Sequence, residues 1–260
     1  MTHNGRPLMN EKHKAVGIEK RDAVAVVTLL RSASRNSMNQ DLVDETRAAL
    51  LELDRDDNVE AIVLVGALPG FCAGSDLKFI GALGLEAMGR FEQECGDLGR
   101  LIGYISKPVV AAVEGFAIGG GFTLATCCDV VVAARGSKWS LPEVPHGWLT
   151  PWGIKSLVAR VGLIKARHLC FCLEPLTAED ARVFGAVDYC CEDGEALSTA
   201  IAVANRLAQL PRPAVAATKR FFSNYLMQDA EAMDFEANRL FLDNCRERAA
   251  QATLDKFRNR

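Results

Sequence analysis

The sequence lacks a dominant charge of either sign, a long hydrophobic run and an apolar leader. Its 30 Lys and Arg residues against 33 Asp and Glu residues leave a formal net charge of −3, which argues against a dedicated nucleic-acid binder. The most apolar stretch, 115–128, contains three consecutive glycines and is too short to span a bilayer. Residues 1–14 are polar and do not resemble a signal peptide. These absences predict a cytoplasmic protein without a nucleic-acid or membrane partner.

The sequence also lacks cysteine pairs at the spacing of metal or redox sites. It has nine cysteines, an odd number, and several are adjacent or nearly so. No CxxC motif occurs, and no His/Cys cluster has zinc spacing. We therefore expect reduced thiols that pack as small hydrophobes, with no metal and no disulfide framework.

What is present is the pattern of a mixed α/β protein of 260 residues, 49% of them apolar. Dense β-branched runs predict buried strands at 23–30, 61–65, 108–113 and 130–134. Helical periodicity predicts a helix that Asn39 caps and that ends near Asp54, and two others at 86–105 and 122–127. Residues 136–151 are expected to form a loop, because they contain prolines and glycine.

The chain is expected to divide into three parts. We expect residues 1–14 to form a flexible tail and residues 15–194 to form an α/β core. Residues 195–260 predict a helical region with amphipathic helices at 195–209, 213–226 and 229–256. Much apolar surface on these helices would remain exposed to solvent unless it packs on the core or on another subunit.

Two glycine-rich turns each follow a buried strand. One is Cys72-Ala73-Gly74-Ser75-Asp76-Leu77-Lys78, and the other is Gly119-Gly120-Gly121, which leads into a helix. Such turns can leave backbone N–H groups unpaired, and partial positive charge collects at a helix N-terminus. Two of them facing each other would form an oxyanion hole, in which each donor contributes roughly 3–4 kcal/mol to transition-state stabilisation. Each turn alone could equally be a packing device.

Four stretches together resemble the enoyl-CoA hydratase/isomerase (crotonase) family: RNSMN at 35–39, GFCAGSDLK at 70–78, the long motif at 107–134 and SLPEVPHG at 140–147. The resemblance implies a crotonase-like spiral of strand–strand–helix units with a C-terminal helical oligomerisation region. It implies a homotrimer or a dimer of trimers. It also implies an acyl-CoA substrate, with no cofactor beyond the coenzyme A moiety of that substrate.

The same resemblance implies roles for individual residues. The backbone N–H groups of Ser75 and Gly120 fall at the positions of the family's oxyanion donors. Other residues fall near the coenzyme A: Ala73, Asp76 and Leu77 at the adenine pocket, and Arg35 and Lys78 near the phosphates. For the two cations, a solvated surface position remains the alternative.

The acid–base positions depart from the family's hydratases, which use two carboxylates. The first position is Thr123 and the second is Glu143. A threonine hydroxyl can orient water or a substrate hydroxyl but does not replace a carboxylate as an acid or base. A single catalytic Glu143 is similar to the family's isomerases and to its hydratase-lyases of hydroxycinnamoyl thioesters. We therefore expect an enoyl-CoA isomerase or hydratase/lyase that works through a thioester enolate.

Several alternatives stay open at this stage. Glu143 could be an exposed loop carboxylate, His146 a packed loop residue, and the three tryptophans core residues rather than an acyl pocket. Asp129 is expected to be structural, and Lys219 to lie on a helix surface or at a subunit contact. The missing second carboxylate also allows a catalytically weak acyl-CoA-binding scaffold, and a decarboxylase or hydrolase of the same family is possible. RNA binding is a further alternative, but the sequence predicts no Lys/Arg-rich helix that would support it.

Overall fold

A six-stranded sheet forms the centre of the computed structural model, which describes residues 15–258. All its strands are parallel except the first, which pairs antiparallel with its neighbour. In spatial order the strands are β1 (Val16–Arg21), β2 (Val24–Leu29), β3 (Ala61–Gly66), β4 (Val109–Val113), β6 (Val130–Ala134) and β9 (Tyr189–Cys191).

The four expected strands are confirmed as β2, β3, β4 and β6. The sequence analysis missed β1 and β9. β1 lies at the edge of the sheet with only Val16 buried, so its sequence carries no apolar run. β9 has three residues, too few for a period to show.

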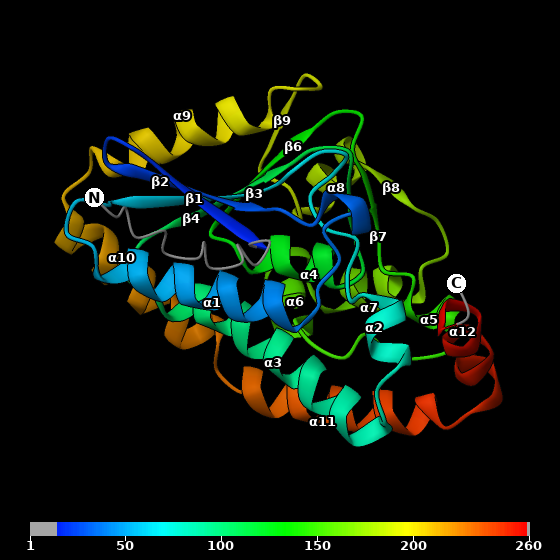
Figure 1. Cartoon of the computed structure of the whole chain (residues 1–260). Coiled ribbons are helices and arrows are strands. Elements are labelled where there is room, and N and C mark those ends of the chain that lie inside the picture. Colours follow the sequence, from blue (N-terminus) through cyan, green and yellow to red (C-terminus); the bar gives the residue numbers. More distant parts are fainter. Residues whose placement is uncertain (1–14, 259–260) are drawn as a thin grey trace, which may run out of the picture.

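Helices cover both faces of this sheet (Figure 1). α9 (Ala196–Ala208) packs on one face, where its alanines and Val203 meet alternate residues of the strands, such as Val63 and Val110. The opposite face and the helices α1 (Gln40–Arg55), α3 (Leu85–Tyr104) and α4 (Gly120–Cys127) form the larger core. Alternation of side chains along each strand separates the two cores. The expected cap of α1 is confirmed, since Asn39 accepts a hydrogen bond from the Leu42 N–H.

A second, three-stranded sheet lies beside the first. It consists of β5 (Phe116–Ile118), β7 (Lys138–Ser140) and β8 (Leu176–Thr177). The expectation of a loop over 136–151 was wrong, because this stretch contains β7 and the short helix α5 (Glu143–His146). β7 has three residues and α5 has four, too few for a repeating pattern to show among the prolines and glycine of this stretch. Glu143 is the first residue of α5.

The remaining helices surround this framework. They are η1 (Ser32–Ser34), α2 (Leu77–Gly81), α6 (Ile154–Val161), α7 (Leu163–Phe171), α8 (Ala178–Phe184), α10 (Arg212–Leu226), α11 (Ala230–Cys245) and α12 (Arg248–Arg258). The single helix expected over 229–256 is two helices, α11 and α12. α11 runs along α3, and α12 turns back to pack on α2 (Figure 1). α12 thereby brings the end of the chain to the turn that contains Ser75. The division at residue 194 stays a prediction, and the tail at 1–14 lies outside the described residues.

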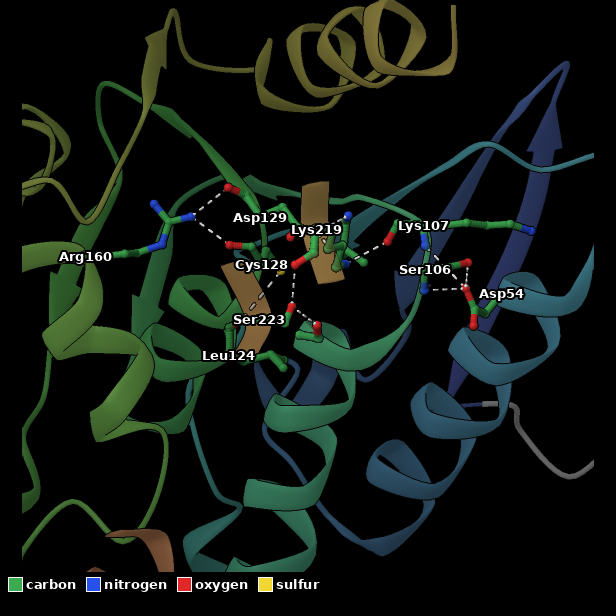
Figure 2. A network of polar contacts seen from close by, with 11 residues as sticks. Asp54, Ser106, Lys107, Leu124, Cys128, Asp129, Arg160, Lys219 and Ser223 are labelled. Atoms are coloured by element: carbon green, nitrogen blue, oxygen red, sulfur yellow. Dashed lines mark hydrogen bonds and ion pairs between the residues drawn. The ribbon is translucent and has the colours of Figure 1, made fainter. Parts of the chain in front are cut away.

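A buried polar network fastens α10 to the body (Figure 2). The Lys219 ammonium donates to the Lys107 carbonyl at 2.7 Å and pairs with Asp129 at 2.6 Å, while Asp129 also accepts from the Val109 N–H. The Ser223 hydroxyl donates to the Gly103 carbonyl. Asp129 is therefore structural, as expected. Lys219, expected on a helix surface or at a subunit contact, is largely buried within this chain.

None of the helices described for residues 15–258 is both long and apolar enough to cross a bilayer. All nine cysteines fall in this range and are free thiols, most of them buried.

We expect Asp129→Ala to lower the free energy of unfolding by about 2 kcal/mol, because it leaves the Lys219 ammonium buried without a counter-ion. Urea unfolding followed by circular dichroism measures the change. The matched control is Glu236→Ala, which removes an exposed ion pair with Arg239 and should cost at most about 1 kcal/mol. Equal losses in the two variants would contradict the structural role of Asp129.

Candidate active site

A cavity of about 650 Å³ opens where the first glycine-rich turn, the start of α4, α5 and the C-terminal helices meet. The residues that sequence analysis selected from four separate stretches all line it: Arg35, Ala73, Ser75, Asp76, Leu77, Lys78, Gly120, Thr123 and Glu143. The fold thus brings the predicted residues to one place.

The two glycine-rich turns run side by side in contact. Cys72 and Ala117 form a parallel bridge, and the Ile118 N–H donates to the Cys72 carbonyl at 3.0 Å. A Cβ on Gly121 would lie only 2.1 Å from that carbonyl oxygen, so only glycine permits this approach. Ser75 and Gly120 both line the cavity just beyond this contact.

The N–H groups of Ser75 and Gly120 are left free of backbone partners in two different ways. Around Ser75, the Gly74 carbonyl and the Asp76 N–H both bond to Met38, so the Ser75 N–H points away from that ladder. Gly120 is the first residue of α4, where an N–H has no intrahelical partner. A Cβ on Gly74 would lie 3.0 Å from the Gly120 nitrogen, so the two backbones are in contact here.

A third loop holds the first turn from behind. Asn36 is fully buried, and its side-chain amide donates to the carbonyls of Ala67 and Gly70 at 2.6 and 2.8 Å. The Arg35 carbonyl accepts from the Ala73 N–H. The RNSMN stretch therefore supports the geometry of the turn.

Glu143 is buried beside the second turn. A Cβ on Gly119 would lie 2.8 Å from its Oε1, and its buried Oε2 has no hydrogen-bond partner. Burial raises the pKa of Glu143 to about 8, and the nearby Glu92 carboxylate adds to the rise, whereas its own N–H and the Thr150 hydroxyl oppose it. A carboxyl with a pKa near the working pH is suited to proton transfer.

Thr123 is buried one helical turn into α4. Its hydroxyl donates to the Gly120 carbonyl at 3.1 Å, which uses its only proton inside the helix. Gly153 packs tightly against its Cβ. Thr123 can therefore accept a hydrogen bond in the cavity but has no proton left to donate.

The sequence analysis did not select Glu92, a second carboxylate that lines the same cavity. It is 1% exposed on α3, and burial raises its pKa to about 7. A signal was present: Glu92 lies four residues after Met88 and three before Cys95, on the face that helical periodicity predicts to be buried. An ionisable residue on such a face is rare unless it has a role.

The residues expected near coenzyme A lie at the mouth of the cavity. Arg35 is exposed, and its guanidinium stacks over the Phe116 ring at 4.3 Å. Lys78 is exposed on α2. The Asp76 carboxylate caps α2 and pairs with Arg31 at 3.0 Å, so it holds the turn in shape. Arg35 and Lys78 are both placed to donate hydrogen bonds to phosphate oxygens.

The remaining candidates are packed residues. His146 lies against the rings of Trp148 and Phe257, and burial followed by the nearby Lys256 lowers its pKa. All three tryptophans are buried; Trp148 and Trp152 also line the cavity, whereas Trp139 does not.

Comparison with known proteins identifies the family of this chain. The sequence profile of the enoyl-CoA hydratase/isomerase family matches residues 19–260. A crotonyl-CoA hydratase of Syntrophomonas wolfei is 34% identical over 230 residues, which cover 85% of this chain and 86% of that protein. A short-chain-enoyl-CoA hydratase of Clostridium acetobutylicum is 32% identical over 224 residues and 85% of both chains.

The fold has close solved counterparts. The crystal structure of an enoyl-CoA hydratase/isomerase from Mycobacterium paratuberculosis superposes with a TM-score of 0.86. The superposition covers 95% of this chain and all of the other, at 24% identity. The expected crotonase-like α/β fold with its C-terminal helical region is therefore confirmed. The chain belongs to the enoyl-CoA hydratase/isomerase family and is an enzyme of that type.

We expect Glu143→Gln to become more stable relative to the wild type as the pH rises. Folding raises the pKa of Glu143 from 4.5 to about 8, so the stability that its protonated form contributes is complete below pH 4.5 and is lost as the pH rises through about 8. Glutamine does not ionise and loses nothing. Urea unfolding at pH 5, 7 and 9 measures the difference between the two proteins, which should widen with pH.

The control for this experiment is Glu86→Gln, which changes an exposed carboxylate on α3. Its difference from the wild type should stay constant. A constant difference for Glu143→Gln as well would contradict the burial of the Glu143 carboxylate.

Proposed function

We propose that this enzyme acts on an acyl-CoA thioester through an enolate, with Glu143 as the group that moves the proton at C2. The thioester oxygen would accept hydrogen bonds from the N–H groups of Ser75 and Gly120. The observation that carries the proposal is the buried Glu143 carboxylate: Glu143 lines the cavity where the two turns meet, and its buried Oε2 has no hydrogen-bond partner among the described residues. The names of the hydratase relatives support the substrate class.

The geometry supports separate roles for the two backbone amides and for Glu143 in this step. The two amides stabilise negative charge that develops on the thioester oxygen when C2 loses a proton. Glu143 removes or returns that proton, and its raised pKa lets it do either near neutral pH. Isomerisation, hydration and hydratase-lyase chemistry all pass through this enolate, so the proposal holds for each. Arg35 and Lys78 would contact the coenzyme A phosphates at the mouth of the cavity.

The family resemblance also predicts a homotrimer or a dimer of trimers. The support in this chain is the large aromatic side chains exposed on α10, among them Phe221, Phe222 and Tyr225, since such surface usually contacts another chain. Light scattering during gel filtration gives the molar mass, and a monomer would refute the prediction.

We expect Glu143→Gln to reduce exchange of the C2 protons of butyryl-CoA in heavy water by at least about 10²-fold. Proton NMR or mass spectrometry follows the deuterium. Binding of butyryl-CoA, measured by calorimetry, should change little, because the amides and the cations that hold the ligand remain.

Two outcomes would contradict the proposal. Full exchange in Glu143→Gln would remove Glu143 from the reaction. No exchange in the wild type with butyryl-CoA, together with no turnover of short, long or aromatic enoyl-CoA esters, would favour an acyl-CoA-binding scaffold.

A further inference from the structure

Glu92 is a buried carboxylate without a counter-ion. It lies on α3, is 1% exposed and lines the cavity together with Glu143. No Lys, Arg or His among residues 15–258 forms an ion pair with it. Burying an ionisable group without a charged partner is costly, and proteins seldom do so in a packing role.

Neutral donors fix the Glu92 side chain. The Trp152 indole N–H donates to its Oε2 at 3.0 Å, and the nearby Ser75 side chain opposes the rise in the pKa of the same carboxyl. Ser75 is the residue whose N–H is proposed to hold the thioester oxygen. Glu92 is thus held next to the reacting end of the substrate, while Glu143 lies beside Gly119 at the other turn.

Water addition to an enoyl thioester needs a base for the water and an acid for C2. Thr123 supplies neither, since its proton is donated to the Gly120 carbonyl. We propose that Glu92 is the second acid–base carboxylate of this site, recruited from α3, and that it activates the water that attacks C3 of a 2-enoyl-CoA. This inference rests on the proposed function and adds hydration to it.

In the proposed hydration step, each bond that forms is matched by one that breaks. Glu92 takes a proton from water while the water oxygen bonds to C3, and the C2–C3 π electrons move toward the thioester oxygen to form the enolate. Protonated Glu143 then gives its proton to C2 as the enolate collapses. One water has been added across the double bond. Glu92 now holds a proton and Glu143 is ionised, and a proton shift between them through water restores the starting state.

The protonation states agree with these roles. Burial raises the pKa of both carboxyls, to about 8 for Glu143 and about 7 for Glu92, so each can exchange a proton near neutral pH. The other ionisable groups that interact with Glu92 are the thiols of Cys95 on α3 and Cys245 on α11. Burial raises the pKa of both thiols, and that of Cys245 reaches about 12, so they stay neutral.

The experiment compares two reactions in the wild type and Glu92→Gln: hydration of crotonyl-CoA and C2 exchange of butyryl-CoA in heavy water. Glutamine can still accept from the Trp152 indole N–H, so the variant removes the ionisable group and keeps this contact. We expect hydration to fall by at least about 10²-fold and C2 exchange to change by less than about threefold. The acidic limb of the hydration pH profile should also disappear. Glu86→Gln on the same helix should match the wild type in both reactions.

A second variant guards against a purely structural effect. Glu92→Ala should lose hydration and recover part of it when formate is added, because formate can occupy the vacated space and act as a base. A residue that only positions Trp152 or Ser75 would show no such rescue.

Four results would overturn the inference. They are undiminished hydration in Glu92→Gln, an equal loss of hydration and exchange, failure of formate to rescue Glu92→Ala, and a wild type that exchanges C2 protons without hydrating any enoyl-CoA. The last leaves the enolate function of Glu143 intact. If the wild type does neither reaction, the proposed function itself fails and the role of Glu92 with it.

Discussion

The approach of two backbone segments, at 72–75 and 117–121, is the constraint on which the site depends. The Ile118 N–H bonds to the Cys72 carbonyl, and Gly121 lies so close to that carbonyl that a side chain would not fit. Just beyond it, Gly74, the residue before Ser75, lies against the Gly120 nitrogen. The contact also places the start of α4 against the cavity, where the helix N-terminus favours negative charge. The loop at Asn36 and the turn at Asp76 support the same contact from outside.

Two carboxylates are buried around this contact, and no cation in the described part of the chain forms an ion pair with either. Glu143 and Glu92 both have raised pKa values, chiefly because burial disfavours their charged forms. Ionisation of these buried carboxyls at neutral and alkaline pH lowers the free energy of unfolding of the protein. A buried ion pair would have been less reactive, because an adjacent cation lowers the pKa of a carboxyl and weakens it as a base. The absence of a paired cation is thus a condition for proton transfer near neutral pH.

The parts of the fold that could be predicted from sequence were those whose apolar runs or repeating patterns extend over many residues. β2, β3, β4 and β6 are uninterrupted apolar runs, and α1 and α3 show clear helical faces. β7 and α5 were missed because each is shorter than the pattern needed to recognise it, and the break between α11 and α12 lacks glycine and proline.

The site residues of the two turns were predicted from motifs. Glu92 was missed because no motif contains it. Its position on the buried face of α3 was the only signal in the sequence. That it lines the same cavity as Glu143 follows only from the folded structure.

The central claim is that two amides polarise one thioester oxygen, and infrared spectroscopy tests it directly. Crotonyl-CoA labelled with ¹³C at the thioester carbonyl would be bound to Glu143→Gln, and its carbonyl stretch compared with that of the free ligand in water. Hydrogen bonds from the Ser75 and Gly120 N–H groups should shift the band to lower wavenumber, and Ser75→Pro, which lacks one of these N–H groups, should reverse much of the shift. A band at the position of the free ligand would contradict the account.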